Sequence, residues 1–395
     1  MQKRKDKINR KKYHSILVIA AIAIVVLLDA GMILMPDHTS SDMENRTLQT
    51  FPKLTFSTLV SGKFESEFET YIADQFPFRN KWITLESTVS RMMGKTESND
   101  IFLAKGGYLI QNFHTPSDEQ YASLLEGYKG IAKLTEGTDI TLNAMIVPTA
   151  VNIYSKKLPF GAVKGDQKAF LTQLQSDLAA SGINWIDLSE PFAACDKATQ
   201  LYYRTDHHWT SDAALLAYQT YNKTLGLNDS TTYSKKILSD SFKGTLSASS
   251  GLRTSETDEI YAYLPDQATD YTVSLTAENT KSASVFDVQS LSTKSQYNVF
   301  FGGNHPEVVI DSASESKKVL MVFKDSYANC FVPFLIPDYA RIIMIDPRYY
   351  TEDISETIQS NGVTDILFLY NANTAAEDHS LYQLTAQFYI RDTSK

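Results

Sequence analysis

Two short segments of this sequence carry side chains that could act together in nucleophilic catalysis. The first, RTDHHWT, places Asp206 two residues before His208. A carboxylate at that spacing can accept the Nδ1 proton of the imidazole, which leaves Nε2 free to act as a general base. We therefore predict a base, His208, oriented by Asp206, with His207 and Trp209 as supporting neighbours.

The second segment, VLMVFKDSYAN (319–329), is an apolar run that leads into a serine. A buried strand that ends at Ser326 would expose the hydroxyl above the sheet, where backbone amides can hold an oxyanion. Ser326 is therefore the predicted nucleophile. The segment GTLSASSG offers rival serines without a preceding apolar strand, and we rank them lower: Ser247, Ser249 and Ser250.

Two other interpretations of the histidine pair stay open. One is a hydrogen-bonded structural pair without chemistry. The other is a metal site of the DHH phosphoesterase type, which would need further aspartate and histidine clusters. We predict that the site holds no metal and that the protein needs no cofactor.

The elements that must position these residues alternate between strands and helices. Short apolar runs separated by helical segments are typical of parallel strands buried on both faces. Strands are expected at 140–147, 183–188, 319–323, 341–345 and 366–370, and helices at 117–134, 166–181 and 211–223. The prediction is an α/β fold with a doubly wound, mostly parallel sheet, which binds ligands at the carboxyl ends of its strands. A Ser/Thr-rich insertion of strands and loops is expected at about 229–295.

The N-terminus predicts a membrane anchor. Residues 15–35 form an apolar run with one charge, Asp29, and as a helix they would span about 30 Å, the thickness of the hydrocarbon core. Residues 1–14 hold seven bases and one acid, which keeps that end cytoplasmic. We predict an uncleaved signal-anchor, with a cleaved signal peptide as the alternative. Residues 36–98 then form a stalk and helical preface, and residues 99–395 form the catalytic domain.

The composition argues against several classes of protein and of metal site. The 46 acids and 37 bases give a net charge of −9, and the 381 residues after the basic tail carry −15. Such an acidic body argues against nucleic-acid binding, which requires lysine and arginine against phosphates. Two cysteines exclude a disulfide scaffold and a cysteine-based zinc site. Cys330 is expected beneath Ser326, and a disulfide with Cys195 is one of its two expected states.

The motif TDHHW resembles that of the DHHW family of bacterial extracytoplasmic proteins, together with ENR (44–46), DQFPFR (74–79) and MIVPT (145–149). That family is similar to the alginate O-acetylation proteins, which implies a permuted SGNH-hydrolase fold with the Asp/His block before the serine block. The resemblance also points to Asn371 as an oxyanion-hole residue. This chain has Lys-Asp-Ser in place of Gly-Asp-Ser, and Asn371-Ala372-Asn373 in place of Gly-x-Asn-Asp.

Three functions follow as expectations. The first is O-acetyl transfer to a cell-surface or secreted polysaccharide by an extracytoplasmic domain on a single-pass anchor in the cell membrane. The second is a carbohydrate acetylesterase with the same triad, because both reactions pass through an acyl-enzyme. The third is a non-catalytic glycan-binding or assembly protein. Because acetyl-coenzyme A is cytoplasmic, the transferase also requires a polytopic membrane-bound O-acyltransferase as its acetyl-donor partner, as the resemblance implies.

Overall fold

The computed structural model describes residues 2–38, 40–41, 46–227, 231–252, 254 and 256–392. The chain divides into two compact units, Met1–Lys95 with Gly251–Arg253 and Thr96–Ser250 with Thr254–Lys395. Two expectations fall partly outside the described residues: Glu44 and Asn45 of the ENR motif, and the start of the insertion at 229–230.

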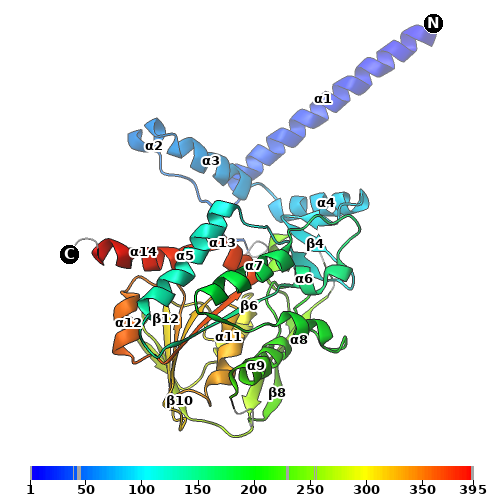
Figure 1. Cartoon of the computed structure of the whole chain (residues 1–395). Helices are drawn as coiled ribbons and strands as arrows, with labels where there is room; N and C mark the ends of the chain where they lie inside the picture. Colours follow the sequence, from blue (N-terminus) through cyan, green and yellow to red (C-terminus); the bar gives the residue numbers. More distant parts are fainter. Residues whose placement is uncertain are drawn as a thin grey trace. The chain divides into compact units, whose positions relative to one another are not determined.

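The second unit is built on an eight-stranded sheet (Figure 1). Its strands run in the order β11 (Thr280–Ser282), β10 (Tyr271–Leu275), β12 (Glu307–Ser312), β14 (Arg341–Ile345), β13 (Val319–Lys324), β15 (Asp365–Asn371), β6 (Thr141–Val147) and β7 (Asn184–Trp185). The five strands from β14 to β7 are parallel, and β12, β10 and β11 add an antiparallel edge. The predicted mostly parallel sheet is confirmed, although the strand expected at 183–188 is only two residues long.

Helices cover both faces of this sheet because successive residues of a buried strand point to opposite sides. In β13, Leu320 and Val322 join one core, whereas Met321 and Phe323 join the other. The first core includes side chains of α8 (Ser189–Ala194), α9 (Ser211–Leu225), α11 (Ala328–Phe331) and the 3-10 helix η4 (Val332–Leu335). The second includes α5 (Asp118–Leu134), α6 (Ala150–Ile153), α7 (Gln167–Ala180), α12 (Ile354–Ser360), α13 (Ala372–Glu377) and α14 (Ser380–Asp392).

Local signals set the ends of the predicted helices. Ser117 caps α5 in the expected capping box with Gln120. Thr210 caps α9, so the DHHW segment is the loop that enters this helix. The sequence pattern was therefore enough to place the predicted base at a helix entrance.

The Ser/Thr-rich region forms part of the central sheet as well as a separate ribbon. Its strands β8 (Tyr233–Phe242) and β9 (Asp258–Pro265) pair as an antiparallel ribbon with the short helix α10 (Thr245–Ser249) between them. β10 and β11 belong to the central sheet itself, and the 3-10 helices η2 (Val288–Ser292) and η3 (Gln296–Val299) follow. A separate sheet, β3 (Glu97–Ser98), β4 (Ile101–Leu103) and β5 (Leu109–Gln111), opens this unit.

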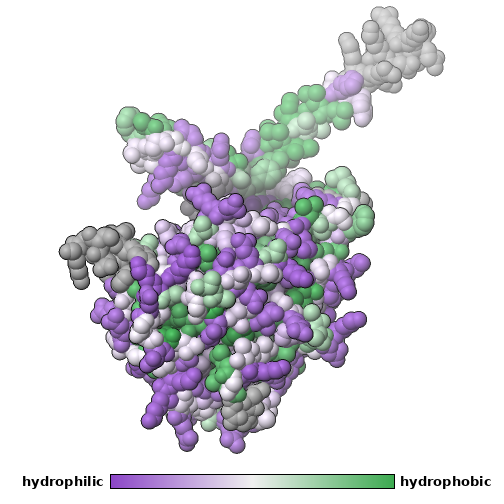
Figure 2. Space-filling model, viewed as in Figure 1, coloured by the Kyte–Doolittle hydropathy of each residue, from purple (hydrophilic) through white to green (hydrophobic). Residues whose placement is uncertain are grey.

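The N-terminal unit contains the long helix α1 (Gln2–Leu34), the strand pair β1 (Ser40–Ser41) and β2 (Arg46–Thr47), and helices α2 (Phe56–Val60), α3 (Lys63–Asp74) and α4 (Arg79–Met92). Within α1, the segment Tyr13–Met32 has a mean hydropathy of 2.6 and is not buried in the protein. Figure 2 shows this apolar stretch as a continuous green surface. Its length and composition fit a single membrane-spanning anchor.

Candidate active site

Ser326 lies directly after β13, at the carboxyl edge of the parallel strands. Asp325 is fully buried beside it and accepts hydrogen bonds from the backbone N–H groups of Tyr327 and Asn371, both at 2.8 Å. Burial raises the pKa of Asp325. Asp325 therefore fixes the turn that carries the serine, and Ser326 presents its hydroxyl at the strand end, as expected from the sequence.

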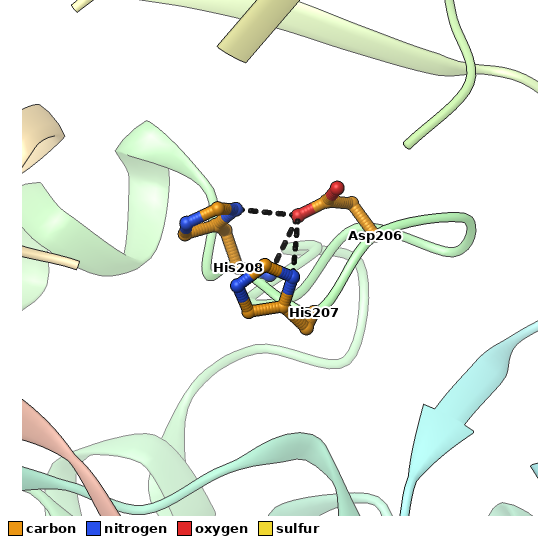
Figure 3. Close-up of side chains that lie close together, drawn as sticks. All are labelled: Asp206, His207 and His208. Atoms are coloured by element: carbon orange, nitrogen blue, oxygen red, sulfur yellow. Dashed lines mark hydrogen bonds and ion pairs between the residues drawn. The ribbon is translucent and has the colours of Figure 1, made fainter. Parts of the chain in front are cut away.

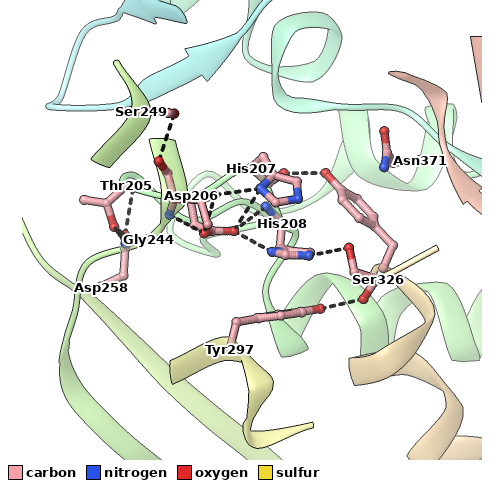
Figure 4. Close-up of polar contacts among 12 residues, drawn as sticks. Thr205, Asp206, His207, His208, Gly244, Ser249, Asp258, Tyr297, Ser326 and Asn371 are labelled. Carbon is pink, nitrogen blue, oxygen red and sulfur yellow. Dashed lines mark hydrogen bonds and ion pairs between the residues drawn. The ribbon is translucent and has the colours of Figure 1, made fainter. Parts of the chain in front are cut away.

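The structure brings the three predicted catalytic side chains into one hydrogen-bonded chain (Figure 4). The Oγ of Ser326 lies 2.7 Å from Nε2 of His208, and Nδ1 of His208 lies 2.5 Å from Oδ1 of Asp206. Because Nδ1 faces a carboxylate, it carries the ring proton, and Nε2 can accept the proton of the serine hydroxyl. The rival serines lie on or beside α10, where the Ser249 hydroxyl donates to the carbonyl oxygen of Thr245.

Asp206 is held as a carboxylate. Its Oδ1 accepts the backbone N–H of His208 at 2.9 Å, and its Oδ2 accepts the backbone N–H and hydroxyl of Thr245 at 2.8 and 3.1 Å. Burial raises the pKa of Asp206, but both histidines and the hydrogen bonds outweigh burial and hold the pKa well below its usual value. Gly244 packs so closely that a Cβ there would lie 2.1 Å from Cβ of Asp206.

A second buried carboxylate, Asp258 of β9, holds the DHHW loop in place. It accepts hydrogen bonds from Gln200 Nε2, from the backbone N–H groups of Arg204 and Thr205, and from the Thr205 hydroxyl, at 2.7 to 2.9 Å. The Thr205 hydroxyl in turn accepts the backbone N–H of Gly244 at 3.0 Å. Asp258 thus ties the loop that carries Asp206 to the segment that supplies Thr245.

Aromatic side chains fix the orientation of His208. The Tyr297 ring stacks on its imidazole with centroids 3.7 Å apart and 12° between the planes, and the Tyr297 hydroxyl donates to the carbonyl oxygen of Ser326 at 3.2 Å. Trp209 donates its indole N–H to the carbonyl oxygen of Tyr327 at 2.9 Å. Trp209 therefore supports the site through the residue that follows the serine, while Tyr297 contacts both His208 and Ser326.

His207 packs against His208, with ring centroids 3.9 Å apart, and both imidazoles face Oδ1 of Asp206 (Figure 3). Its Nδ1 is 3.0 Å from the Thr245 hydroxyl and 3.5 Å from Oδ1 of Asp206. Burial and the neighbouring His208 lower its pKa to about 4. Ligand atoms of the three residues lie within 4.8 Å of one another, close enough for a metal ion. However, both oxygens of Asp206 already accept hydrogen bonds, so a metal would have to displace them.

Asn371 ends β15 and lines the same pocket as Ser326. Its side-chain N–H groups donate to Asp325 Oδ2 at 2.6 Å and to Thr374 Oγ1 at 2.8 Å. Its Oδ1 accepts the backbone N–H groups of Asn373 and Thr374 and so caps α13. In this arrangement the Asn371 side chain stabilises the turn and the helix, and an oxyanion role would require it to give up one of these bonds.

The backbone N–H of Ser326 is differently placed. Within the described part of the chain it donates to no other group, whereas the N–H groups of Asp325, Tyr327, Ala328 and Asn329 all have acceptors. A free N–H at the nucleophile suits an oxyanion.

Lys324, which replaces the glycine that the resemblance led us to expect before Asp325, is buried. Its Nζ donates to Asn304 Oδ1 at 2.9 Å and Asn329 Oδ1 at 3.0 Å, and it lies 3.7 Å from Oδ2 of Asp346. Burial lowers its pKa to about 8. Arg348 donates two hydrogen bonds to the same Asp346, from Nε at 2.8 Å and from Nη2 at 2.7 Å. An ion network centred on the buried Asp346 therefore lies at the end of β13, next to the serine.

Cys195 and Cys330 are both free thiols. Cys330 is buried one helical turn after Ser326 and its Sγ lies 3.7 Å from the carbonyl oxygen of Tyr327. Burial raises its pKa to about 12. The structure therefore has a buried, protonated thiol where a disulfide was the alternative.

The serine opens onto a pocket of about 360 Å³. All residues that line it belong to the second unit, and they include Ser326, His207, Thr245, Arg348, Asn371 and Glu377. Four contributors to the site were not found from the sequence: Thr245, Asp258, Tyr297 and Arg348. Only Thr245 had a signal in the sequence. It follows Gly244 in GTLSASSG, the segment that supplied the rival serines.

A three-layered α/β unit with serine, histidine and aspartate at the carboxyl ends of its parallel strands has the fold of the SGNH hydrolase-like proteins. Residues 108–294 match the family model of the SGNH hydrolase-like domain of acetyltransferase AlgX. The resemblance and fold class expected from the sequence are thereby confirmed.

Individual relatives agree with this fold. The probable alginate O-acetylase AlgJ of Pseudomonas syringae pv. tomato is 23% identical over 184 residues, which are 44% of this chain and 46% of that protein. The chain thus matches about half the length of this curated relative. The crystal structure of a DHHW family protein from Eubacterium siraeum superposes with a TM-score of 0.62 at 24% identity and covers 73% of this chain and 96% of that one. Bacillus cereus PatB1 has a TM-score of 0.59 at 20% identity and covers 71% and 99%.

Proposed function

We propose that this protein is a membrane-anchored O-acetyltransferase that acetylates a polysaccharide outside the cytoplasm through an acetyl-enzyme on Ser326. The observation that carries the proposal is the unbroken chain from Ser326 Oγ through His208 to Asp206, at 2.7 and 2.5 Å. The acetyl group and the polysaccharide come from the names of the relatives, acetyltransferase AlgX and probable alginate O-acetylase AlgJ.

The first half-reaction forms the acetyl-enzyme. Ser326 Oγ attacks the carbonyl carbon of an acetyl ester while His208 Nε2 takes the hydroxyl proton. The bond from the carbonyl carbon to the leaving oxygen then breaks, and the leaving oxygen receives that proton from His208. Asp206 stabilises the imidazolium that exists between these two steps.

The second half-reaction passes the acetyl group to the sugar. A sugar hydroxyl attacks the acetyl-Ser326 carbonyl and gives its proton to His208, and Ser326 Oγ leaves and takes that proton back. The backbone N–H of Ser326 is the proposed donor to the oxyanion in both halves, with the Asn371 side chain as a weaker candidate. Loss of one such donor raises a barrier by about 3 kcal/mol.

The anchor fits an extracytoplasmic role. Seven bases in residues 1–14 keep the N-terminus cytoplasmic, so the second unit would lie on the outer side. An acetyl-enzyme there needs an activated donor, and a polytopic membrane-bound O-acyltransferase is the partner we propose to deliver it. The anchor would hold the catalytic domain near that partner and raise its effective concentration.

The test of the catalytic proposal uses the full chain in detergent with a chromogenic acetyl ester, with and without an oligosaccharide acceptor. Ser326→Ala should reduce ester turnover by about 10⁴-fold or more. Ser181→Ala is the matched control because Ser181 follows α7 at the opposite edge of the sheet. Acetylated product supports the transferase, and hydrolysis alone supports the esterase. If neither reaction occurs, the glycan-binding alternative is supported.

The partner is tested in cells. Residues 1–35 are replaced by a cleavable secretion signal, and polysaccharide acetylation is measured. We expect acetylation to fall although the secreted domain still hydrolyses the chromogenic ester. Wild-type acetylation by this secreted form in cells that lack every membrane acyltransferase would overturn the partner proposal.

A further inference from the structure

The charges that face the catalytic pocket carry information about its acceptor. The lining is mostly neutral and polar, with amide and hydroxyl side chains such as Asn99, Gln111 and Asn373. Among the described residues that line the pocket, Arg348 is the single lysine or arginine, and Glu377 is the single carboxylate. His207 is neutral at physiological pH, because burial and His208 lower its pKa to about 4.

The positive charge of Arg348 is already used. Two of its N–H groups donate to the fully buried Asp346, and Oδ2 of Asp378 lies 4.0 Å from its Nε. If Arg348 turned toward an anionic ligand, Asp346 would lose two charge-assisted hydrogen bonds in the interior, which is costly. Arg348 is therefore a poor receptor for a carboxylate or a phosphate on a sugar.

Glu377 adds a negative charge to the same pocket. Its side chain is exposed, and its carboxylate has no hydrogen-bond partner in the part of the chain that the structure describes. A carboxylate that lines the same pocket as the nucleophile can accept hydrogen bonds from sugar hydroxyl or ammonium groups, and it repels other carboxylates. The charge of −15 on the 381 residues after the basic tail acts in the same direction.

We infer that the acceptor is a glycan whose acetylated sugar carries no carboxylate, sulfate or phosphate, and that Glu377 accepts a hydrogen bond from it. This inference rests on the proposed function. It separates this protein from relatives named for alginate, because alginate is a polyuronate. In the transfer step, the attacking sugar hydroxyl gives its proton to His208 and displaces Ser326 Oγ, while Glu377 holds a neighbouring hydroxyl or amino group and exchanges no proton.

The experiment measures acetyl transfer by the full chain in detergent from p-nitrophenyl acetate. Three oligosaccharides of matched length serve as acceptors: a neutral glucan, a chitosan oligomer and an oligomannuronate. Mass spectrometry counts acetylated product, and p-nitrophenol release measures donor turnover in the same tubes. We expect the neutral and amino acceptors to be acetylated at least ~10-fold faster than the uronate at low salt. The reason is that repulsion between the uronate and Glu377 carboxylates lowers the affinity for the uronate at least ~10-fold. Added salt should raise only the uronate rate.

Variants separate this inference from the proposed function. Glu377→Gln should lower transfer to chitosan and raise transfer to the uronate, each rate being expressed relative to p-nitrophenol release by the same variant. Glu136→Gln, an exposed carboxylate outside the pocket, is the matched control. If the wild-type chain prefers the uronate, or responds equally to both substitutions while it still transfers acetyl groups, the inference is wrong. If the wild type acetylates none of the three acceptors, or does not turn over the ester, the proposed function fails instead.

Discussion

Replacement of Gly244 by alanine is expected to disable the site without any change in a catalytic side chain. The backbone at Gly244 is extended, with φ −86° and ψ −176°, so alanine meets no conformational strain there. The new Cβ, however, would lie 2.1 Å from Cβ and 2.3 Å from Oδ2 of Asp206. Because carbon atoms in contact are about 3.5 Å apart, one of the two segments must move by more than ~1 Å.

That displacement can be converted to a rate. Asp206 contacts His208 at 2.5 Å and Thr245 at 2.8 Å, so a shift of this size breaks at least one of these bonds. A misplacement of about 1 Å costs on the order of 10²-fold, and loss of the carboxylate's orienting role costs about 10⁴-fold. We therefore expect kcat/KM of Gly244→Ala for p-nitrophenyl acetate to fall by between ~10²-fold and ~10⁴-fold.

The assay compares this variant with Gly182→Ala in the same detergent, with thermal unfolding measured alongside. Gly182 has φ +76° and open space around its Cβ position, so alanine there costs about 1–2 kcal/mol of stability and should leave turnover unchanged. If Gly244→Ala does not fold, Thr245→Val removes one hydrogen bond to Asp206 without the clash and should cost ~10-fold in kcat/KM. A wild-type kcat/KM in Gly244→Ala would refute the reasoning. If Gly244→Ala does not fold, a wild-type kcat/KM in Thr245→Val would do so.

Three further outcomes follow from the same contacts. Asp258→Ala should lower the free energy of unfolding by more than ~3 kcal/mol, because several buried donors lose their acceptor; urea denaturation checks this, and a loss below 1 kcal/mol on this scale would contradict it. Asn371→Ala should cost ~1–2 kcal/mol as a lost helix cap, and unchanged ester turnover would remove Asn371 from the proposed oxyanion site. His207 has its pKa lowered from 6.5 to about 4 in the folded state, so the unfolded chain takes up its proton first as pH falls. Its contribution to stability is therefore present above pH 6.5 and lost between 6.5 and 4, and His207→Gln should flatten the stability–pH curve in that window.

Local patterns were sufficient for the apolar N-terminal helix, the strands and the Asp206–His208 pair. An apolar run of membrane length, a strand buried on both faces and a capping box are each complete within a short segment, so their physics is visible in the sequence. The Asp206 and His208 pair also lies within three residues. Ser326 could be added because the carboxyl ends of parallel strands meet at one edge of a sheet.

The surroundings of that triad depended on pairings between distant segments. Asp258 reaches the DHHW loop because β9 pairs with β8 in a particular register, and Tyr297 reaches His208 from a 3-10 helix after the central sheet's edge strands. Asn371 was expected from the family resemblance. Its side-chain partners were decided by the parallel pairing of β13 with β15, which sets Asp325 beside it. A polar or aromatic residue in a Ser/Thr-rich stretch has no local signature of such contacts, because the free energy that selects them comes from packing between segments far apart in the chain.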